Sequence, residues 1–255
     1  MTRTAPIDVI IQGDCLEEMK KLPDGCIDMI LCDLPYGTTQ NHWDTIIPFH
    51  LLWEQYRRIA KKNAAMVFTA AQPFATDLIN SARDMFRYDI VWHKTMPVGF
   101  FNSGKMPLRA HELVLVFYRG LPTYNPQGTH CKPGIRKRNA SGAGHNYHNT
   151  PLTDTKNRGI TTPTSVVVFS NNNNGNVGHG TQKPVALFEY LIKTYTNEGD
   201  LVLDNCIGSG TTAVAAKRTG RHFIGIELYE EYCEIARKRV AAVPARLDRW
   251  AEADA

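Results

Sequence analysis

The segment Leu201-Val-Leu-Asp204-Asn-Cys-Ile-Gly208-Ser-Gly210-Thr-Thr212 decides the fold. It combines an apolar strand, a glycine-rich turn and the start of a helix, so the backbone can approach a ligand closely and the helix N-terminus offers free N–H groups. The strand predicted at 222–226 ends in Glu227, an acid placed to accept both hydroxyls of an adenosine ribose. Read alone, the Gly-x-Gly turn is equally consistent with a tight strand–helix connection. The turn and the acid together indicate a nucleoside cofactor.

Apolar strand patterns alternate with helix patterns along most of the chain. The predicted strands lie at 7–12, 27–32, 65–70, 88–93, 113–118, 165–169, 200–203 and 222–226. The predicted helices lie at 15–21, 49–61, 75–85, 185–195, 211–219 and 230–240. Such alternation predicts an α/β fold with a doubly wound, mostly parallel sheet.

The region 119–180 interrupts this alternation and is rich in Gly, Asn, Thr, Pro and His. So long a loop is uncommon in a compact domain unless it is a functional insert, although a surface excursion without function is the alternative. Between Arg119 and Arg158 there are seven Lys or Arg residues and one acid, so this segment carries +6 and the rest of the chain −2. A basic insert on a mildly acidic body predicts contact with a polyanion.

The overall composition fits an ordinary globular protein. The chain has 255 residues, of which 43% are apolar and 21% charged, which excludes a disordered chain or a coiled coil. It has no apolar run of the ~20 residues that a membrane helix needs, and its N-terminus lacks a secretory signal. Six cysteines without a Cys-x-x-Cys pair predict reduced thiols in a cytoplasmic protein. The spacings of His130, Cys131, His145 and His148 fit no common zinc site, so no metal is expected.

A second informative segment is Met29-Ile-Leu-Cys-Asp33-Leu-Pro35-Tyr36-Gly37. An apolar strand ends in a carboxylate, followed by a proline that stiffens the turn and by an aromatic residue. In doubly wound sheets ligands bind at the carboxyl ends of the strands, so Asp33 and Tyr36 are expected to project into a site. In isolation, the tetrapeptide 33–36 is also consistent with an ordinary strand-ending turn.

Together the two segments resemble the beta class of amino DNA methyltransferases, in which an Asp/Asn/Ser-Pro-Pro-Tyr/Phe motif precedes the cofactor motif. Leu34 departs from that pattern because it replaces the first proline. Further pieces match the family in the same order, across residues 7–240: Gly13–Cys15, Ile90–Lys94, Ala110–Glu112 and His179–Pro184. The resemblance implies a class I S-adenosylmethionine-dependent methyltransferase fold with permuted motif order. It also implies a catalytic half at 1–118, a target-recognition insert at 119–178, a cofactor-binding half at 179–245 and a tail at 246–255.

The resemblance assigns roles to individual residues. Asp14 is expected to bind the cofactor adenine, Glu227 the ribose, and Lys183 the methionine end. The implied catalytic residues are Asp33, Leu34, Pro35 and Tyr36. The implied cofactor-binding residues are Asp14, Cys15, Asp33, Thr181, Gln182, Lys183, Asp204, Cys206, Gly208, Ser209, Gly210, Thr211, Thr212, Glu227 and Leu228.

Elementary chemistry agrees with these roles. The exocyclic amine of a nucleobase is a poor nucleophile because its lone pair is delocalised into the ring. Two acceptors on its hydrogens localise that lone pair and aim it at a sulfonium methyl group. Asp33 supplies one acceptor and the backbone carbonyl of residue 34 the other, which leucine provides as well as proline. Tyr36 offers a π-face for a base that has been extruded from a duplex.

These features predict an adenine-N6 DNA methyltransferase acting on double-stranded DNA, with Arg136, Lys137 and Arg138 contacting phosphates. The initial Asp of the motif favours adenine; cytosine N4 is the alternative, and methylation of RNA would use the same motif. A catalytically silent DNA-binding protein is the alternative from another class. A nicotinamide dehydrogenase is disfavoured because the turn lacks the third glycine of the dinucleotide fingerprint. The family resemblance further suggests a homodimer, and it leaves open a cognate restriction endonuclease as against a solitary or phage-borne methylase.

Overall fold

The computed structural model describes residues 4–38, 44–136, 155–157, 159–172 and 182–244. The chain forms two compact units, Pro126–Thr164 and the remainder, which comprises Met1–Asn125 and Ser165–Ala255. In the smaller unit β6 (Gly134–Arg136) pairs with β7 (Thr155–Asn157) in an antiparallel ribbon. None of the described helices is long and apolar enough to cross a membrane.

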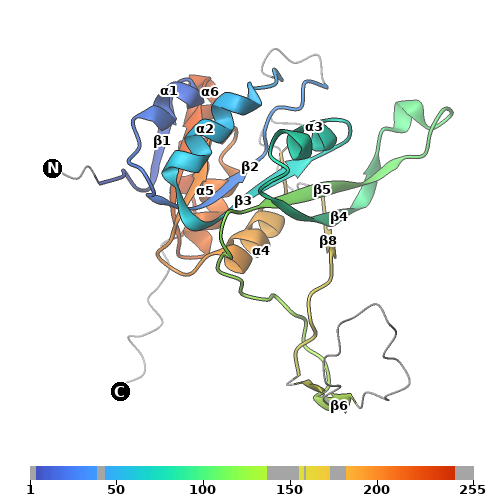
Figure 1. The fold of residues 1–255 in the computed structure, drawn as a ribbon. Coiled ribbons are helices and arrows are strands. Elements are labelled where there is room, and N and C mark those ends of the chain that lie inside the picture. The colour runs from blue at the N-terminus through green and yellow to red at the C-terminus, as the bar shows by residue number, and fades with distance from the viewer. Residues whose placement is uncertain (1–3, 39–43, 137–154, 158, 173–181, 245–255) are drawn as a thin grey trace, which may run out of the picture. The chain divides into compact units, whose positions relative to one another are not determined.

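Among the described residues, the larger unit contains one eight-stranded sheet (Figure 1). Its spatial order is β1 (Val9–Gln12), β10 (His222–Glu227), β9 (Leu201–Asp204), β2 (Ile27–Cys32), β3 (Ala60–Ala70), β5 (Arg109–Phe117), β4 (Phe86–Val98) and β8 (Val166–Phe169). Strand β5 runs antiparallel to both of its neighbours, and the other five pairings are parallel. The predicted doubly wound, mostly parallel α/β sheet is therefore confirmed.

Helices cover both faces of this sheet. The first core lies under α1 (Cys15–Lys20), α2 (Phe49–Ile59) and α3 (Phe74–Ser81), and the second under α4 (Val185–Tyr195), α5 (Thr211–Arg218) and α6 (Glu230–Ala241). Strand β2 shows the arrangement, because Ile30 and Cys32 enter the first core whereas Met29 and Leu31 enter the second. Burial on both faces explains why this strand is apolar without alternation.

Two strands are longer than the sequence pattern predicts. Strands β4 and β5 continue past the predicted 88–93 and 113–118 and join through a short 3-10 helix, η1 (Phe100–Asn102), as a hairpin that projects from the sheet (Figure 1). Pro97 and the loss of alternation conceal this extension in the sequence. Strand β8 was predicted within the region 119–178, and in the structure it pairs with β4 in the main sheet.

The register places the carboxyl ends of the parallel strands side by side. Cys32 is level with Phe68 on β3, and Ile30 is level with Leu203 on β9. Asp204 in turn pairs with Gly225 on β10, next to Glu227. The residues that end or follow these strands therefore share one edge of the sheet, where ligands bind in doubly wound folds.

Candidate functional site

The carboxylate of Asp33 stands at this edge, directly after β2, and is held from three sides. Its Oδ1 accepts hydrogen bonds from the Tyr36 hydroxyl at 2.9 Å and from the Thr69 hydroxyl at the end of β3. Its Oδ2 forms an ion pair with the ammonium of Lys183 at 2.8 Å. Burial and the Asp33 carboxylate raise the pKa of Tyr36 well above its ordinary value, so the hydroxyl stays protonated and donates.

The turn that follows Asp33 is fixed by packing and by backbone contacts. The side chain of Leu34 is buried in the first core, so burial anchors the turn where the family pattern has a proline. The Asp44 carboxylate accepts from the backbone N–H groups of Gly37 and Thr38 at 2.8 and 2.9 Å. Gly37 has φ +66°, a left-handed conformation that favours glycine. The turn is therefore rigid despite the change of residue at position 34.

The aromatic ring of Tyr36 stacks on Phe74 of α3, with a centroid separation of 4.9 Å and an interplanar angle of 27°. Phe49 meets Phe74 edge-on at 5.7 Å and so supports it from α2. The ammonium of Lys183 lies over the Tyr36 ring, 5.4 Å from its centroid. These contacts fix the orientation of the Tyr36 ring.

A chain of alternating charges connects Asp33 with β4 and β5. Lys183 Nζ lies 2.8 Å from Asp33 Oδ2 and 3.4 Å from Glu112 Oε2, and Glu112 Oε1 accepts from Lys94 Nζ at 2.5 Å. Burial opposes the charge of Lys183, but the nearby carboxylates of Asp33 and Glu112 outweigh it and raise the pKa of Lys183 well above its ordinary value. Glu112 Oε2 is buried and accepts no hydrogen bond from the described residues. Lys183 thus lies near two carboxylates, Asp33 and Glu112, and Glu112 Oε2 accepts no hydrogen bond from the described residues.

The glycine-rich turn after β9 closes on the acid at the end of β10. Glu227 Oε2 accepts from the backbone N–H of Gly208 at 2.9 Å, and its Oε1 accepts from the N–H of Tyr229 at 3.1 Å. Burial raises the pKa of Glu227 and these backbone donors oppose the rise. Gly210 begins α5 at φ +88°, and a Cβ there would lie 2.8 Å from the Cβ of Ala236. Gly210 therefore serves close packing of the turn against α6.

The Asp204 carboxylate accepts hydrogen bonds from two residues of the same turn region. Its Oδ1 accepts from the backbone N–H of Cys206 at 3.0 Å and its Oδ2 accepts from the Thr212 hydroxyl. Burial raises the pKa of Asp204 to about 6, whereas these two hydrogen bonds lower it. Ser209 is also buried, and Arg239 of α6 donates to its carbonyl and hydroxyl oxygens at 2.5 and 2.9 Å. The glycine-rich turn is therefore held by Asp204 at the end of β9 and by Arg239 of α6.

At the outer side of this edge, Asp14 is the N-cap of α1. Its Oδ1 accepts from the backbone N–H groups of Leu16 and Glu17 at 2.8 and 3.2 Å. Cys15, the first residue of α1, hydrogen-bonds the thiol of Cys206 from the glycine-rich turn, and this contact and burial raise the pKa of Cys15 far above its ordinary value. The N-terminal and cofactor segments predicted from sequence are therefore neighbours.

Most of the predicted site residues lie at one edge of the sheet. The others lie away from this edge or outside the described residues. Leu228 follows β10 and is exposed, and Gln182 precedes α4. Thr181, Lys137 and Arg138 lie outside the described residues. Arg136 belongs to β6 in the smaller unit. No group of three His, Cys, Asp or Glu side chains is placed to hold a metal ion in the described part of the chain.

Sequence reasoning assigned no role to three residues of the Asp33 environment. Thr69 lies inside an apolar strand, where no motif marks it. Lys94 and Glu112 belong to segments that match the family, and their ion pair follows from the antiparallel pairing of Trp92 with Glu112 on β4 and β5. The signal that could have found them is a lysine and an acid in strands expected to pair.

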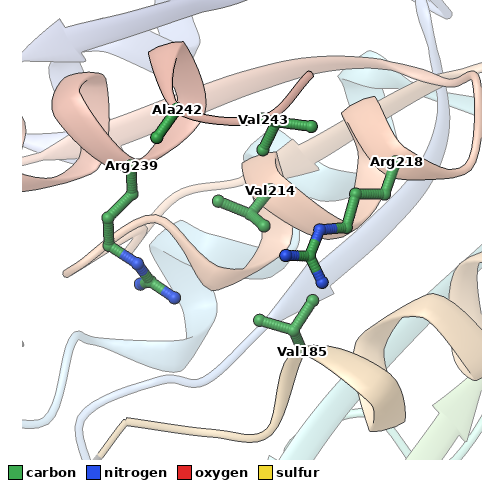
Figure 2. A pocket seen from close by; sticks show the side chains of 6 residues that line it. All are labelled: Val185, Val214, Arg218, Arg239, Ala242 and Val243. Atoms are coloured by element: carbon green, nitrogen blue, oxygen red, sulfur yellow. The ribbon is translucent and has the colours of Figure 1, made fainter. Parts of the chain in front are cut away.

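A separate cavity of about 160 Å³ lies between α4, α5 and α6 (Figure 2). Figure 2 shows the guanidinium groups of Arg218 and Arg239 facing it, beside three valines. The lining residues are Val185, Val214, Arg218, Arg239, Ala242 and Val243. None of the predicted site residues lines it. Arg239 connects this cavity to the glycine-rich turn through its bonds to Ser209.

Comparison with known proteins gives consistent results. A family model described as DNA methylase, of the N6_N4_Mtase type, matches residues 27–238. The putative methylase YubD of Escherichia coli K12 is 27% identical over 257 residues, which cover 96% of this chain and 95% of that protein. The type II methyltransferase M.HinfI of Haemophilus influenzae is 25% identical, over 93% of this chain and 69% of that one.

Two solved structures are similar along nearly their whole length. The crystal structure of an M1.HpyAVI–SAM complex has a TM-score of 0.62 and 26% identity, and the match covers 91% of this chain and 98% of that one. The cytosine-N4-specific PvuII DNA methyltransferase has a TM-score of 0.67 at 19% identity, over 92% of this chain and 87% of that one. At that identity the PvuII comparison speaks to the fold alone.

Proposed function

Because the chain belongs to the DNA methylase family of the N6_N4_Mtase type, we propose that it transfers a methyl group from S-adenosylmethionine to the N6 amine of an adenine extruded from double-stranded DNA. The observation that carries the proposal is the fixed Asp33 carboxylate beside the Tyr36 ring at the ligand edge of the sheet. DNA methyltransferase activity follows from the family, and the choice of adenine rests on Asp33 as the first residue of the motif.

The residues at the sheet edge suit S-adenosylmethionine as the cofactor. Glu227 is a carboxylate that can exchange its bond from the Gly208 N–H for the ribose hydroxyls, and Lys183 can neutralise the methionine carboxylate. A Cβ on Gly208 would meet nothing nearer than the Cys206 carbonyl at 4.0 Å, so the space above the turn is open. When bound, the cofactor supplies an electrophilic methyl group on a sulfonium.

The protein's own groups prepare the amine for that methyl group. Thr69 and Tyr36 hold Asp33 Oδ1, so Oδ2 is the atom that accepts one amine hydrogen once Lys183 releases it. The backbone carbonyl of Leu34 accepts the other. Localising the lone pair by two fixed acceptors acts mainly in the transition state, when positive charge develops on nitrogen.

Lys183 must adjust when the amine arrives, because its ammonium occupies Asp33 Oδ2. Glu112 Oε2 lies 3.4 Å away and offers a second, buried partner. We infer that Lys183 shifts toward Glu112, or toward the cofactor carboxylate, and releases Asp33 to the base. Lys94 in turn holds Glu112 in place through its 2.5 Å ion pair.

Modification mapping tests the proposal directly. DNA from a methylation-free bacterial host that expresses the parent protein would be sequenced with base-resolved detection of N6-methyladenine and N4-methylcytosine. We expect N6-methyladenine at one recurring sequence with the parent and none with Asp33→Ala. N4-methylcytosine at a recurring sequence would replace the adenine assignment. A cofactor-binding parent that modified no DNA would support a silent DNA-binding protein.

A further inference from the structure

The hairpin between β4 and β5 exposes an unusual amount of apolar surface. Phe101 is 100% exposed and Phe100 is 77% exposed, both in η1 at the tip. The arms are apolar as well, and their exposed large side chains are Met96, Val98, Met106 and Leu108. Such a concentration on a projecting element marks an interaction site, because a folded protein gains nothing from it in water.

The tip is built as a fixed shape. Gly99 takes the left-handed φ of 92° that turns the chain into η1, and Asn102 N–H donates to the Gly99 carbonyl at 2.9 Å. The Asn102 carbonyl then accepts from the N–H groups of Lys105 and Met106 at 2.9 and 3.0 Å. Phe100 and Phe101 are therefore presented on a preformed turn, which lowers the entropy lost on binding.

The base of the hairpin is anchored next to the catalytic edge. Asn171, which follows β8, donates to the Met96 carbonyl at 2.9 Å and accepts from the Met96 N–H at 3.0 Å. Lys94, at the start of the projecting part, belongs to the charge chain that ends at Asp33. About five residues of extended chain lead from Lys94 to Gly99, a reach of roughly 16 Å. That reach exceeds the depth of ~8 Å of either DNA groove.

The positive charge of the hairpin favours a polyanion as its partner. Between residues 95 and 109 the chain has Lys105 and Arg109 and no acid. A positive, aromatic tip on a narrow arm suits a polyanion whose interior is a stack of flat apolar bases.

We propose that this hairpin is a wedge that enters a groove of the duplex and inserts Phe100 and Phe101 into the base stack next to the extruded target base. The inference rests on the proposed function, because only an enzyme that takes a base out of the helix leaves a gap to be filled. Apolar side chains of this kind, phenylalanine among them, unstack base steps when proteins bend DNA. The wedge holds the duplex open while Asp33 receives the amine.

The test compares the parent with a double variant, Phe100→Ala with Phe101→Ala, and with Ile7→Ala, which removes an apolar side chain that is 51% exposed before β1, away from the proposed sites. Each protein would methylate two duplexes carrying the mapped recognition site, one fully paired and one with a mismatch at the target base. We expect the double variant to be at least ~10-fold slower on the paired duplex and near the parent on the mismatched one, whose unpairing cost is already lower. Ile7→Ala should match the parent on both.

Several results would overturn the wedge. They are an unchanged rate on the paired duplex, an equal loss on both duplexes, and a loss accompanied by dissociation of a dimer in analytical ultracentrifugation, which would show that a second copy covers the hairpin.

Cofactor affinity by calorimetry verifies that the double variant is folded. Fluorescence of 2-aminopurine at the target position gives a readout independent of methyl transfer. Brightening by the parent and not by the double variant would support the wedge even if another atom were methylated, whereas equal brightening would exclude it.

Discussion

The ammonium of Lys183 lies 2.8 Å from Asp33 Oδ2 and 3.4 Å from Glu112 Oε2, so one lysine stands between the proposed catalytic carboxylate and a second buried acid. Isolated charges are costly to bury, and this chain of opposite charges makes their burial tolerable. It also gives Lys183 two alternative partners. The proposed chemistry depends on that choice, because Asp33 can accept the substrate amine only as far as Lys183 releases it.

Removing the carboxylate of Asp33 should abolish most of the catalysis. For Asp33→Ala we expect kcat to fall by at least ~100-fold, the usual size of one lost electrostatic contact in the transition state. The affinity for S-adenosylmethionine should change less than kcat, because the main contact proposed for Asp33 is with the amine of the base. Asp33→Asn keeps one oxygen acceptor, so its kcat in a radiolabelled methyl-transfer assay should lie between those of the parent and of Asp33→Ala. Near-parental turnover of the alanine variant would contradict the proposed role of the tetrapeptide 33–36.

Glu112 should matter through Lys183. Glu112→Gln keeps the size of the side chain but removes the charge that competes with Asp33 for Lys183. We expect kcat to fall by about tenfold, less than the ~100-fold loss of a group that contacts the reacting atoms itself, and the free energy of unfolding to fall by about 3 kcal/mol, the cost of breaking a buried ion pair. Glu54→Gln, at an exposed position on α2, is the matched control. A variant that lost stability but kept the parental kcat would limit Glu112 to a structural role.

The cofactor site is tested at Glu227. Glu227→Ala removes the acceptor proposed for the ribose hydroxyls, and S-adenosylmethionine binding should weaken by about 1.5–3 kcal/mol, the scale of hydrogen bonds to a charged group. It also leaves the Gly208 and Tyr229 N–H groups without their acceptor, so Glu227→Gln should lose less. Isothermal calorimetry provides the measurement, with the exposed Glu234→Ala as control. Unchanged affinity would place the cofactor elsewhere.

Stability should depend on pH through Asp204. Its folded pKa of about 6 lies above the ordinary value of 3.8, so between these values the folded state holds more protons than the unfolded state. The free energy of unfolding therefore receives a contribution from Asp204 that is present below pH ~4 and is lost as the pH rises through 6. In Asp204→Asn this contribution is absent. Urea unfolding at pH 4, 5, 6 and 7 should show the parent losing stability relative to the variant, and a constant difference would refute the assignment.

The sheet, and the position of most candidate site residues at one edge of it, could be predicted from the sequence because both depend on local patterns. Strands buried on both faces are continuous apolar runs, and the acids that follow them, Asp33 and Glu227, stand out against those runs. Parallel strands then bring such residues to one edge without further information. Thr69 could not be predicted as a partner of Asp33, since that contact arises from the register between β2 and β3.

The projecting hairpin escaped prediction for a different reason. Six large apolar side chains between Met96 and Leu108 are exposed, so their positions match neither the pattern of a buried strand nor that of a polar surface. Hydrophobic periodicity reports burial in the chain's own core, and a surface shaped for a partner carries no such period. Leu34 is the opposite case, because it breaks the family motif yet is buried in the chain's own first core.

The last prediction concerns the basic run Arg136-Lys137-Arg138, whose first residue is the last residue of β6 in the smaller unit. If this run contacts phosphates, replacing all three residues with alanine should weaken DNA binding and reduce the slope of log affinity against log salt by about 2–3, roughly 0.9 for each lost contact. A control that replaces three exposed lysines of the larger unit, Lys20, Lys21 and Lys238, removes the same charge and should leave the slope near the parent's. Fluorescence anisotropy over a salt series measures both.

Cofactor affinity and melting temperature should be unchanged in the triple variant, because the larger unit carries its own cores. Loss of either would make the run structural, and a full parental slope would mean that DNA is held by other groups, the projecting hairpin first among them.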